Sequence, residues 1–82
     1  MLSEVFERLE RLDYLIRIKS TGTPNQLAER LNMSERTLYG FLNEMRELGA
    51  PIKYSRAKQT YYYCTNGRFQ LRFYENQKSQ LP

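Results

Sequence analysis

The chain has 82 residues, which suffices for one domain with a single modest core. It has no histidine and one cysteine, so an internal disulfide framework is excluded and the commonest metal ligand and general base are missing. No 18-residue apolar run or secretory signal pattern is present. These features predict a non-enzymatic cytoplasmic protein with no membrane segment, no metal and no other cofactor.

The positive charge is unevenly distributed along the chain. The net charge is +4 and the isoelectric point is near 9.4, which favours an anionic partner. Residues 1–22 have a net charge of zero, residues 23–49 of −1 and residues 50–82 of +5. If phosphate is bound, the last third of the chain should supply most of the counterion release. The alternative is a solvated basic surface without a ligand.

Residues 2–18 are predicted to form an amphipathic helix with a broad apolar face. Part of that face repeats with heptad-like spacing, at Leu2, Val5, Leu9, Leu12 and Ile16. Two heptads are too few to argue for a coiled coil. Packing of this face against a core is therefore preferred, with dimerisation as the alternative.

Residues 23–48 are predicted to form two short helices joined by a tight turn. Thr23 is a good N-cap, Pro24 suits the first helical position, and Gln26 completes a capping box. Asn32 tolerates the left-handed conformation that a sharp exit from the first helix requires.

The second of these helices is expected over residues 34–48. Ser34 is its N-cap and Gly49 ends it. Its apolar residues recur at helical spacing, at Leu38, Phe41, Leu42, Met45 and Leu48. Two capped helices separated by two residues predict a helix-turn-helix.

Beyond Pro51 the pattern becomes that of strands. Residues 52–55 and 60–65 alternate around a polar, basic connection and predict a β-hairpin, with Cys64 as a small strand residue. Asn66-Gly67 is a strong hairpin signal and predicts a third strand over residues 68–73. Residues 75–82 have nothing to bury and are expected to form a flexible tail after a single domain at 1–74.

The resulting fold class is α+β: three helices, a hairpin and a probable third strand, which is the order of a winged helix. QLAERLNMSERTLYGFLNEMRELGAPIKY followed by TYYY resembles the winged helix-turn-helix of the DeoR and WYL-regulator type (HTH type 11). It is also similar to the DNA-binding end of bifunctional biotin ligases. The resemblance implies a bacterial transcription regulator that binds double-stranded DNA.

In such a fold the start and exposed face of the second motif helix would enter the major groove. The residues expected there are Ser34, Glu35, Arg36, Thr37, Tyr39, Gly40 and Asn43. Arg36 could bind guanine or phosphate, and Asn43 could pair with adenine. Thr23 and Asn25 would offer a phosphate contact at the start of the first motif helix.

The hairpin would form the basic wing of the fold. The residues expected to contact phosphates or the minor groove are Lys53, Arg56, Lys58 and Gln59. Tyr61 and Tyr63 share one strand face and are expected to pack in the core.

Several residues of the second helix have non-functional explanations. Arg36 could pair with Glu35 or Glu29, and Asn43 could simply be solvated. Gly40 departs from the resembled family, which often has arginine near this position. Because glycine destabilises a helix by about 1 kcal/mol, either DNA approaches closely at Gly40 or the hairpin packs tightly against it.

The sequence is compatible with three functions. The leading one is a small DNA reader, with a homodimer through helix 2–18 or strand 68–73. The alternative is a protein–protein interaction module that uses the same scaffold without binding DNA. A third uses the strand Tyr61–Tyr63 as a stacking platform for single-stranded nucleic acid, and it requires solvent-exposed rings.

Overall fold

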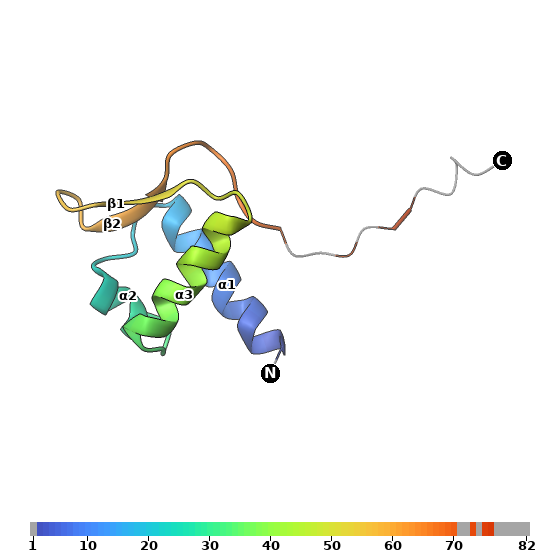
Figure 1. The fold of residues 1–82 in the computed structure, drawn as a ribbon, viewed down its shortest axis with the longest axis horizontal. Coiled ribbons are helices and arrows are strands. Elements are labelled where there is room, and N and C mark those ends of the chain that lie inside the picture. Colours follow the sequence, from blue (N-terminus) through green and yellow to red (C-terminus); the bar gives the residue numbers. More distant parts are fainter. Residues whose placement is uncertain (1, 71–72, 74, 77–82) are drawn as a thin grey trace.

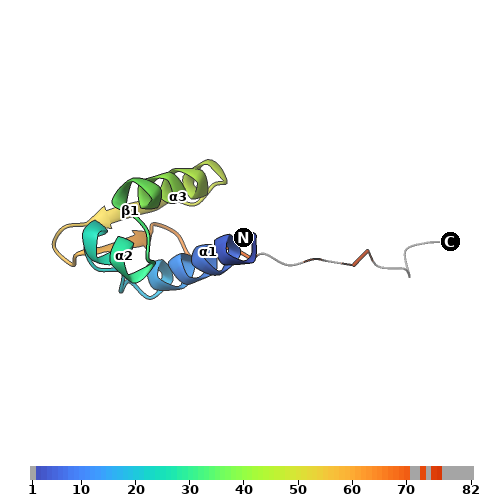
Figure 2. The same ribbon diagram turned by 90° about the horizontal axis from the view of Figure 1, so that it is seen from below.

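The computed structural model describes residues 2–70, 73, 75 and 76. Its helices are α1 (Leu2–Arg17), α2 (Pro24–Arg30) and α3 (Glu35–Glu47), and its strands are β1 (Ile52–Ser55) and β2 (Thr60–Tyr63) (Figure 1). α1 and α3 lie along opposite sides of the domain and α2 closes one end (Figure 2). The order and arrangement confirm a small α+β winged helix.

Only the second half of α1 belongs to the core. Leu12 and Ile16 are fully buried, whereas Leu2 and Val5 are 65% and 41% exposed. The N-terminal end of α1 projects away from the sheet (Figure 1). The expectation that α1 packs against the core is therefore confirmed from Leu12 onward, and its first two turns overhang.

The two motif helices begin and end where their caps predict. The Thr23 hydroxyl accepts a hydrogen bond from the Gln26 amide at 3.2 Å, and the Gln26 side chain accepts from the Thr23 amide at 3.0 Å. Asn32 adopts a φ of 57°, and the Ser34 hydroxyl accepts from the Thr37 amide at 3.1 Å. The starts of both motif helices are thus stabilised by hydrogen bonds between residues close in the sequence, without help from tertiary contacts.

The core lies where the three helices meet beneath the hairpin. Its buried apolar side chains are Leu12, Leu15, Ile16, Leu27, Ala28, Leu31, Leu38, Leu42, Met45, Ile52 and Tyr61. Leu48, by contrast, is 73% exposed, because it is the C-cap of α3 and lies beyond the last turn that faces the core. The apolar repeat of α3 therefore continues one step past the buried part of the helix.

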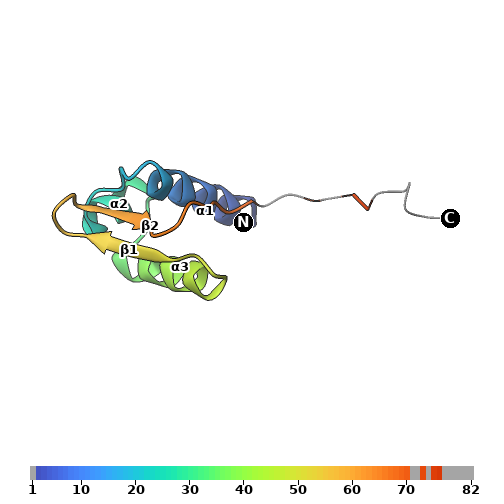
Figure 3. The same cartoon turned by 90° about the horizontal axis from the view of Figure 1, so that it is seen from above.

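The hairpin is a two-stranded antiparallel sheet in which β1 lies over α3 and β2 over α1 (Figure 3). Lys53 pairs with Tyr62 and Tyr54 with Tyr61. Because paired residues share a face and Tyr61 is buried in the core, Lys53 and Tyr62 lie on the outer face. The hairpin and the inward direction of Tyr61 are confirmed.

The third strand is the part of the fold that was predicted wrongly. Residues 64–66 form a bend, and residues 68–70 and 73 are not in a strand. Phe69 instead packs against the core, and its amide donates to the Asp13 carboxylate at 3.2 Å. Cys64 is exposed and lies outside β2. Residues 71–72 and most of the predicted tail (77–82) lie outside the described residues.

Asp13 explains why the chain takes this course. Its side chain is buried, with 3% exposure, and it accepts three hydrogen bonds. The donors are the Tyr63 hydroxyl at 2.6 Å, the Arg17 Nε at 3.0 Å and the Phe69 amide. A buried carboxylate is tolerated only when it is paired and hydrogen-bonded. The segment after β2 therefore follows α1 instead of turning back along β2.

A second polar contact joins the α1–α2 connection to β2. The Thr21 amide donates to the Thr60 hydroxyl at 3.1 Å, and the Tyr61 amide donates to the Thr21 hydroxyl at 2.9 Å. Both threonines are buried. The connection thus supplies the edge of β2 with hydrogen-bond partners and holds the hairpin on the helices.

Candidate nucleic-acid interface

α3 has a buried side and an open side. Leu38, Leu42 and Met45 are each at most 1% exposed, and they face the core. Arg36 and Asn43, on the other side of the helix, are exposed, as Gly40 is. α3 lies next to α2 (Figure 1). The core-facing and exposed sides of α3 are therefore those expected from its helical period, and contact of the exposed side with DNA stays a prediction.

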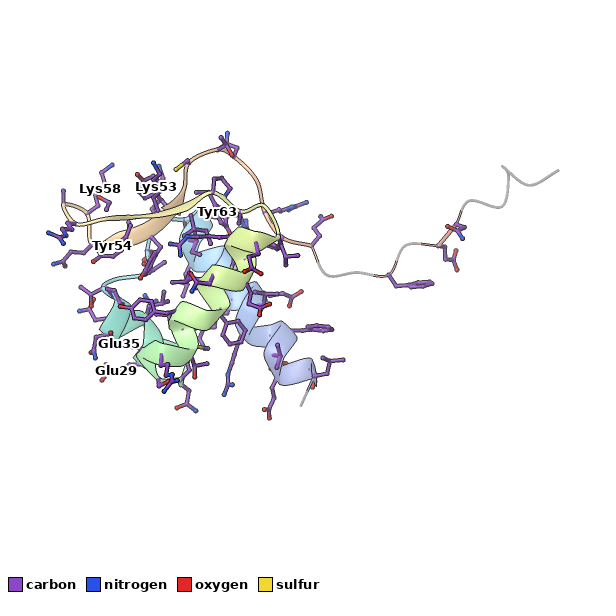
Figure 4. The ribbon with its side chains drawn as sticks, in the orientation of Figure 1. Glu29, Glu35, Lys53, Tyr54, Lys58 and Tyr63 are labelled. Carbon is purple, nitrogen blue, oxygen red and sulfur yellow. The ribbon has the colours of Figure 1, made fainter. Side chains whose placement is uncertain are left out.

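Arg36 is available for an external ligand. Among the described residues it forms no ion pair or hydrogen bond, so the alternative explanation, pairing with Glu29 or Glu35, does not apply. Glu35 instead accepts from the Asn25 amide nitrogen at 3.0 Å and from the Tyr39 hydroxyl at 3.5 Å. Glu35 lies where α2 meets α3 (Figure 4). Its carboxylate thereby orients Asn25 and Tyr39, two further residues of the predicted interface.

Asn43 is oriented by a residue that sequence reasoning did not select. Arg46 donates from Nη1 to the Asn43 side-chain oxygen at 3.2 Å and from Nε to the Ile52 carbonyl at 3.1 Å. Arg46 therefore links the exposed face of α3 to the start of β1. The available signal was a basic residue one turn after Asn43, and that signal is too common to be selective.

Gly40 has open space around it. A Cβ placed on it would meet no heavy atom within 4 Å. Tight packing against the hairpin, one of the two explanations for this glycine, is therefore wrong. The other explanation, close approach of DNA to the α3 backbone, stays a prediction.

The capping residues already have partners inside the protein. The Ser34 hydroxyl donates to the Thr37 hydroxyl at 3.0 Å, and Thr23 belongs to the capping box of α2. Asn25 is fixed by Glu35. Phosphate contacts from these residues remain a prediction.

The four wing residues are all exposed: Lys53, Arg56, Lys58 and Gln59. Figure 4 shows Lys53 and Lys58 on the side of the hairpin away from the helices, with Tyr54 on the opposite side. The hairpin tip is fixed locally, since the Lys58 amide donates to the Ser55 hydroxyl at 3.2 Å. Gln59 has a φ of 52°, which closes the turn.

The inward-facing tyrosines of the hairpin are structural. Tyr61 is 4% exposed, and its ring lies 4.9 Å from that of Tyr54, with the planes tilted by 60°. Burial raises the pKa of Tyr61 to about 12. Burial, followed by the hydrogen bond to Asp13, also raises the pKa of Tyr63 above its usual range. Since Tyr61 is closed to solvent, the stacking platform proposed for single-stranded nucleic acid is not present.

Comparison with known proteins identifies the architecture independently. The model of the helix-turn-helix (HTH) domain family matches residues 8–63, which include the second half of α1, both motif helices and the whole hairpin. No curated protein and no solved structure was found to match the chain. Among the helices that the structure describes, none combines the length and apolar character needed to cross a membrane. The match implies DNA as the partner of this fold, and the chain belongs to the helix-turn-helix domain family, as a member with a winged-helix hairpin.

Proposed function

We propose that the protein is a small transcription regulator of the bacterial type that reads specific sites in double-stranded DNA. The observation that carries the proposal is the open face of α3, where Arg36 has no partner among the described residues. In a helix laid in the major groove, Arg36 would bind a guanine edge. Asn43 would approach adenine, and Tyr39 a thymine methyl group or a phosphate.

The wing would supply most of the affinity in this proposal. α3 carries two basic and three acidic residues, so the reading helix alone has little attraction for phosphate. Arg56 and Lys58 at the hairpin tip would contact the backbone beside the groove that α3 occupies. Each phosphate neutralised lowers the slope of log K against log salt by about 0.9.

The test measures binding to duplex DNA over a range of salt concentrations. Wild type should lose affinity with salt, and Arg56→Ala/Lys58→Ala should show a slope shallower by about 2. The matched control is Arg8→Ala/Arg11→Ala, which removes the same charge from α1 and should leave the slope nearly unchanged. Selection from a random pool should then yield a site whose preference relaxes in Arg36→Ala. Absence of duplex binding even at low salt would reject the proposal.

A protein–protein interaction is the second candidate, because an apolar groove lies between the overhanging end of α1 and α3. It is lined by Val5, Leu9, Thr37, Gly40, Phe41, Glu44, Met45 and Leu48. A homodimer through the exposed start of α1 would cover the side of the groove at Val5 and Leu9 and would give a small reader two half-sites. The alternative route through a strand at 68–73 loses its basis, since residues 68–70 and 73 form no strand.

Sedimentation equilibrium distinguishes a homodimer interface at the apolar groove from a binding site for a different protein. If α1 mediates a dimer, wild type should associate as concentration rises, and Val5→Asp/Leu48→Asp should remain monomeric with an unchanged circular dichroism spectrum. A monomer at every concentration would exclude the homodimer and leave a different protein partner as the occupant of the groove.

A further inference from the structure

The two arginines of α3 have different surroundings. Arg36, in the first turn, has no partner among the described residues, whereas Arg46, in the last turn, already donates two hydrogen bonds within the protein. The Arg46 Nε donates to the Ile52 carbonyl at 3.1 Å, and its Nη1 donates to the Asn43 side-chain oxygen at 3.2 Å. Arg46 is therefore engaged at the reading face of α3 before any ligand arrives.

The contact with Ile52 fixes the position of the Arg46 guanidinium. Ile52 is buried at the start of β1, the strand that lies over α3 (Figure 3). Because a guanidinium is planar and its donors point in fixed directions, a hydrogen bond at Nε also restricts where Nη1 points. Asn43 precedes Arg46 by three positions on the helix, the spacing at which exposed side chains meet. The Asn43 oxygen is thus held by a group that the start of β1 holds in turn.

This contact also decides which end of the Asn43 amide faces away from Arg46. A guanidinium carries donors and no acceptor, so only the amide oxygen can face it, and Nδ2 is turned away as a free donor. The oxygen keeps one of its two lone pairs. Pairing of asparagine with adenine uses both ends of the amide, since Nδ2 donates to the adenine ring nitrogen and the oxygen accepts from the adenine amino group. A reversed amide would place a donor opposite that amino group and could not pair.

We propose that Arg46 is a positioning residue for base recognition, which holds the Asn43 amide in one orientation and so strengthens the preference for adenine at one position of the DNA site. The proposal rests on the function proposed for α3 and extends it to a residue that need not touch a base. A side chain that is already immobilised loses less freedom on binding, an effect of about two- to tenfold in affinity. The gain is confined to the base that Asn43 contacts, because Arg46 holds no other exposed side chain of α3 among the described residues.

The experiment compares affinities for duplexes that differ at a single base pair. Selection from a random pool with wild type gives the site, and the position whose preference disappears in Asn43→Ala is the one that Asn43 reads. Fluorescence anisotropy then gives the ratio of the affinities for adenine and for guanine at that position. Because both affinities are measured on one protein preparation, any loss of folded protein in a variant cancels from the ratio.

Arg46→Met should lower this ratio about two- to tenfold and leave the preference at the position read by Arg36 unchanged. Arg46→Lys keeps the charge but lacks the fork that reaches both acceptors, so it should lower the ratio as well. In the Asn43→Ala background, Arg46→Met should have no effect on the ratio. The matched control is Arg30→Met, since Arg30 also donates to a backbone carbonyl but lies on α2, and it should keep the wild-type ratio.

NMR relaxation of the Asn43 side-chain amide tests the same contact without DNA. The amide should be rigid in wild type and mobile in Arg46→Met. An amide as mobile in wild type as in the variant would overturn the positioning role and would leave the DNA-reading function proposed for α3 intact.

Other DNA-binding results would also contradict the proposal. If Arg46→Met weakens binding to every duplex by the same factor and the salt slope becomes shallower by about 0.9, Arg46 contacts a phosphate instead. If binding weakens equally with the slope unchanged, its role is structural. If wild type selects a site in which no position depends on Asn43, the positioning role fails and the reading function of α3 stands through Arg36. If wild type binds no duplex, both proposals fail.

Discussion

Gly40 lowers the stability of α3, and no contact within the described residues explains why glycine is present there. It lies exposed in the middle of α3, and a Cβ added to it would have no heavy atom within 4 Å. No described part of the chain packs closely enough on Gly40 to require glycine, and close approach of DNA at this position stays a prediction.

Gly40→Ala should therefore separate stability from binding. Alanine is favoured in a helix interior by about 1 kcal/mol, so the free energy of unfolding should rise by about 0.5–1 kcal/mol. Duplex affinity should fall, because the added methyl group prevents close approach to the backbone. Urea denaturation and fluorescence anisotropy measure the two effects. If the duplex affinity of this variant is unchanged, DNA does not contact α3 at Gly40.

Tyr63 shows the reverse situation, a residue whose hydroxyl serves the interior. It donates to the buried Asp13 carboxylate at 2.6 Å. Tyr63→Phe should lower the free energy of unfolding by about 1.5–3 kcal/mol, the range for hydrogen bonds to charged groups. Tyr62→Phe on the outer face is the matched control and should change stability by no more than about 0.5 kcal/mol. Equal effects of the two substitutions would contradict this role for Asp13.

For single residues, the sequence predicted well which side chains are exposed and poorly which groups they hydrogen-bond. The helical period placed Arg36 and Asn43 opposite Leu38 and Leu42, as the structure shows. It gave no means of predicting that Arg46 would bind Asn43, or that Asp13 would be buried. Arg46 is held by the Ile52 carbonyl, and Asp13 by the Tyr63 hydroxyl and the Phe69 amide, and only tertiary folding brings these groups within hydrogen-bond distance. Charged residues such as Asp13 are ordinarily exposed.

At the scale of elements, the sequence predicted a helix correctly wherever capping residues next to it in the chain form the hydrogen bonds at its ends. α2 and α3 begin at Thr23 and Ser34, whose capping bonds span three residues. The third strand failed because Asn66-Gly67 signals only a turn. A strand also needs an edge to pair with, and the Asp13 carboxylate provided a stronger partner for the Phe69 amide.

The hydrogen bonds between the α1–α2 connection and β2 predict how a substitution at Thr60 changes stability. Thr60→Val removes the acceptor of the buried Thr21 amide and preserves the shape of the side chain. An unsatisfied buried amide costs about 1–3 kcal/mol, so stability should fall by that amount. The hairpin amides should also exchange hydrogen faster. Thr65→Val, at an exposed position, is the control. Full stability in Thr60→Val would show that water replaces the lost bond.

For the whole molecule, the inward-facing tyrosines predict how stability depends on pH. The pKa of Tyr61 is raised to about 12, and that of Tyr63 is also raised, both chiefly by burial. The unfolded chain, with tyrosines near pKa 10, releases protons before the folded chain does. Stability from these groups is therefore complete below about pH 10 and is lost as the pH rises toward 12.

Urea midpoints at a series of pH values from neutral to alkaline measure this effect. The midpoint should fall above about pH 10, and Tyr61→Phe should make the decline less steep because it removes one of the titrating groups. A midpoint that stays constant through the tyrosine titration range would contradict the burial of these rings.

The long sequence separation between Asp13 and two of its hydrogen-bond donors has a consequence for folding during synthesis. Its partners Tyr63 and Phe69 follow it by 50 and 56 residues, so α1 leaves the ribosome long before either donor exists. The nascent helix must keep this carboxylate in water until the hairpin emerges, and burial of α1 becomes favourable only when residues 60–69 can close over it. Completion of the fold is thus tied to the last part of the domain to be synthesised, and a chain released before residue 63 should leave α1 undocked.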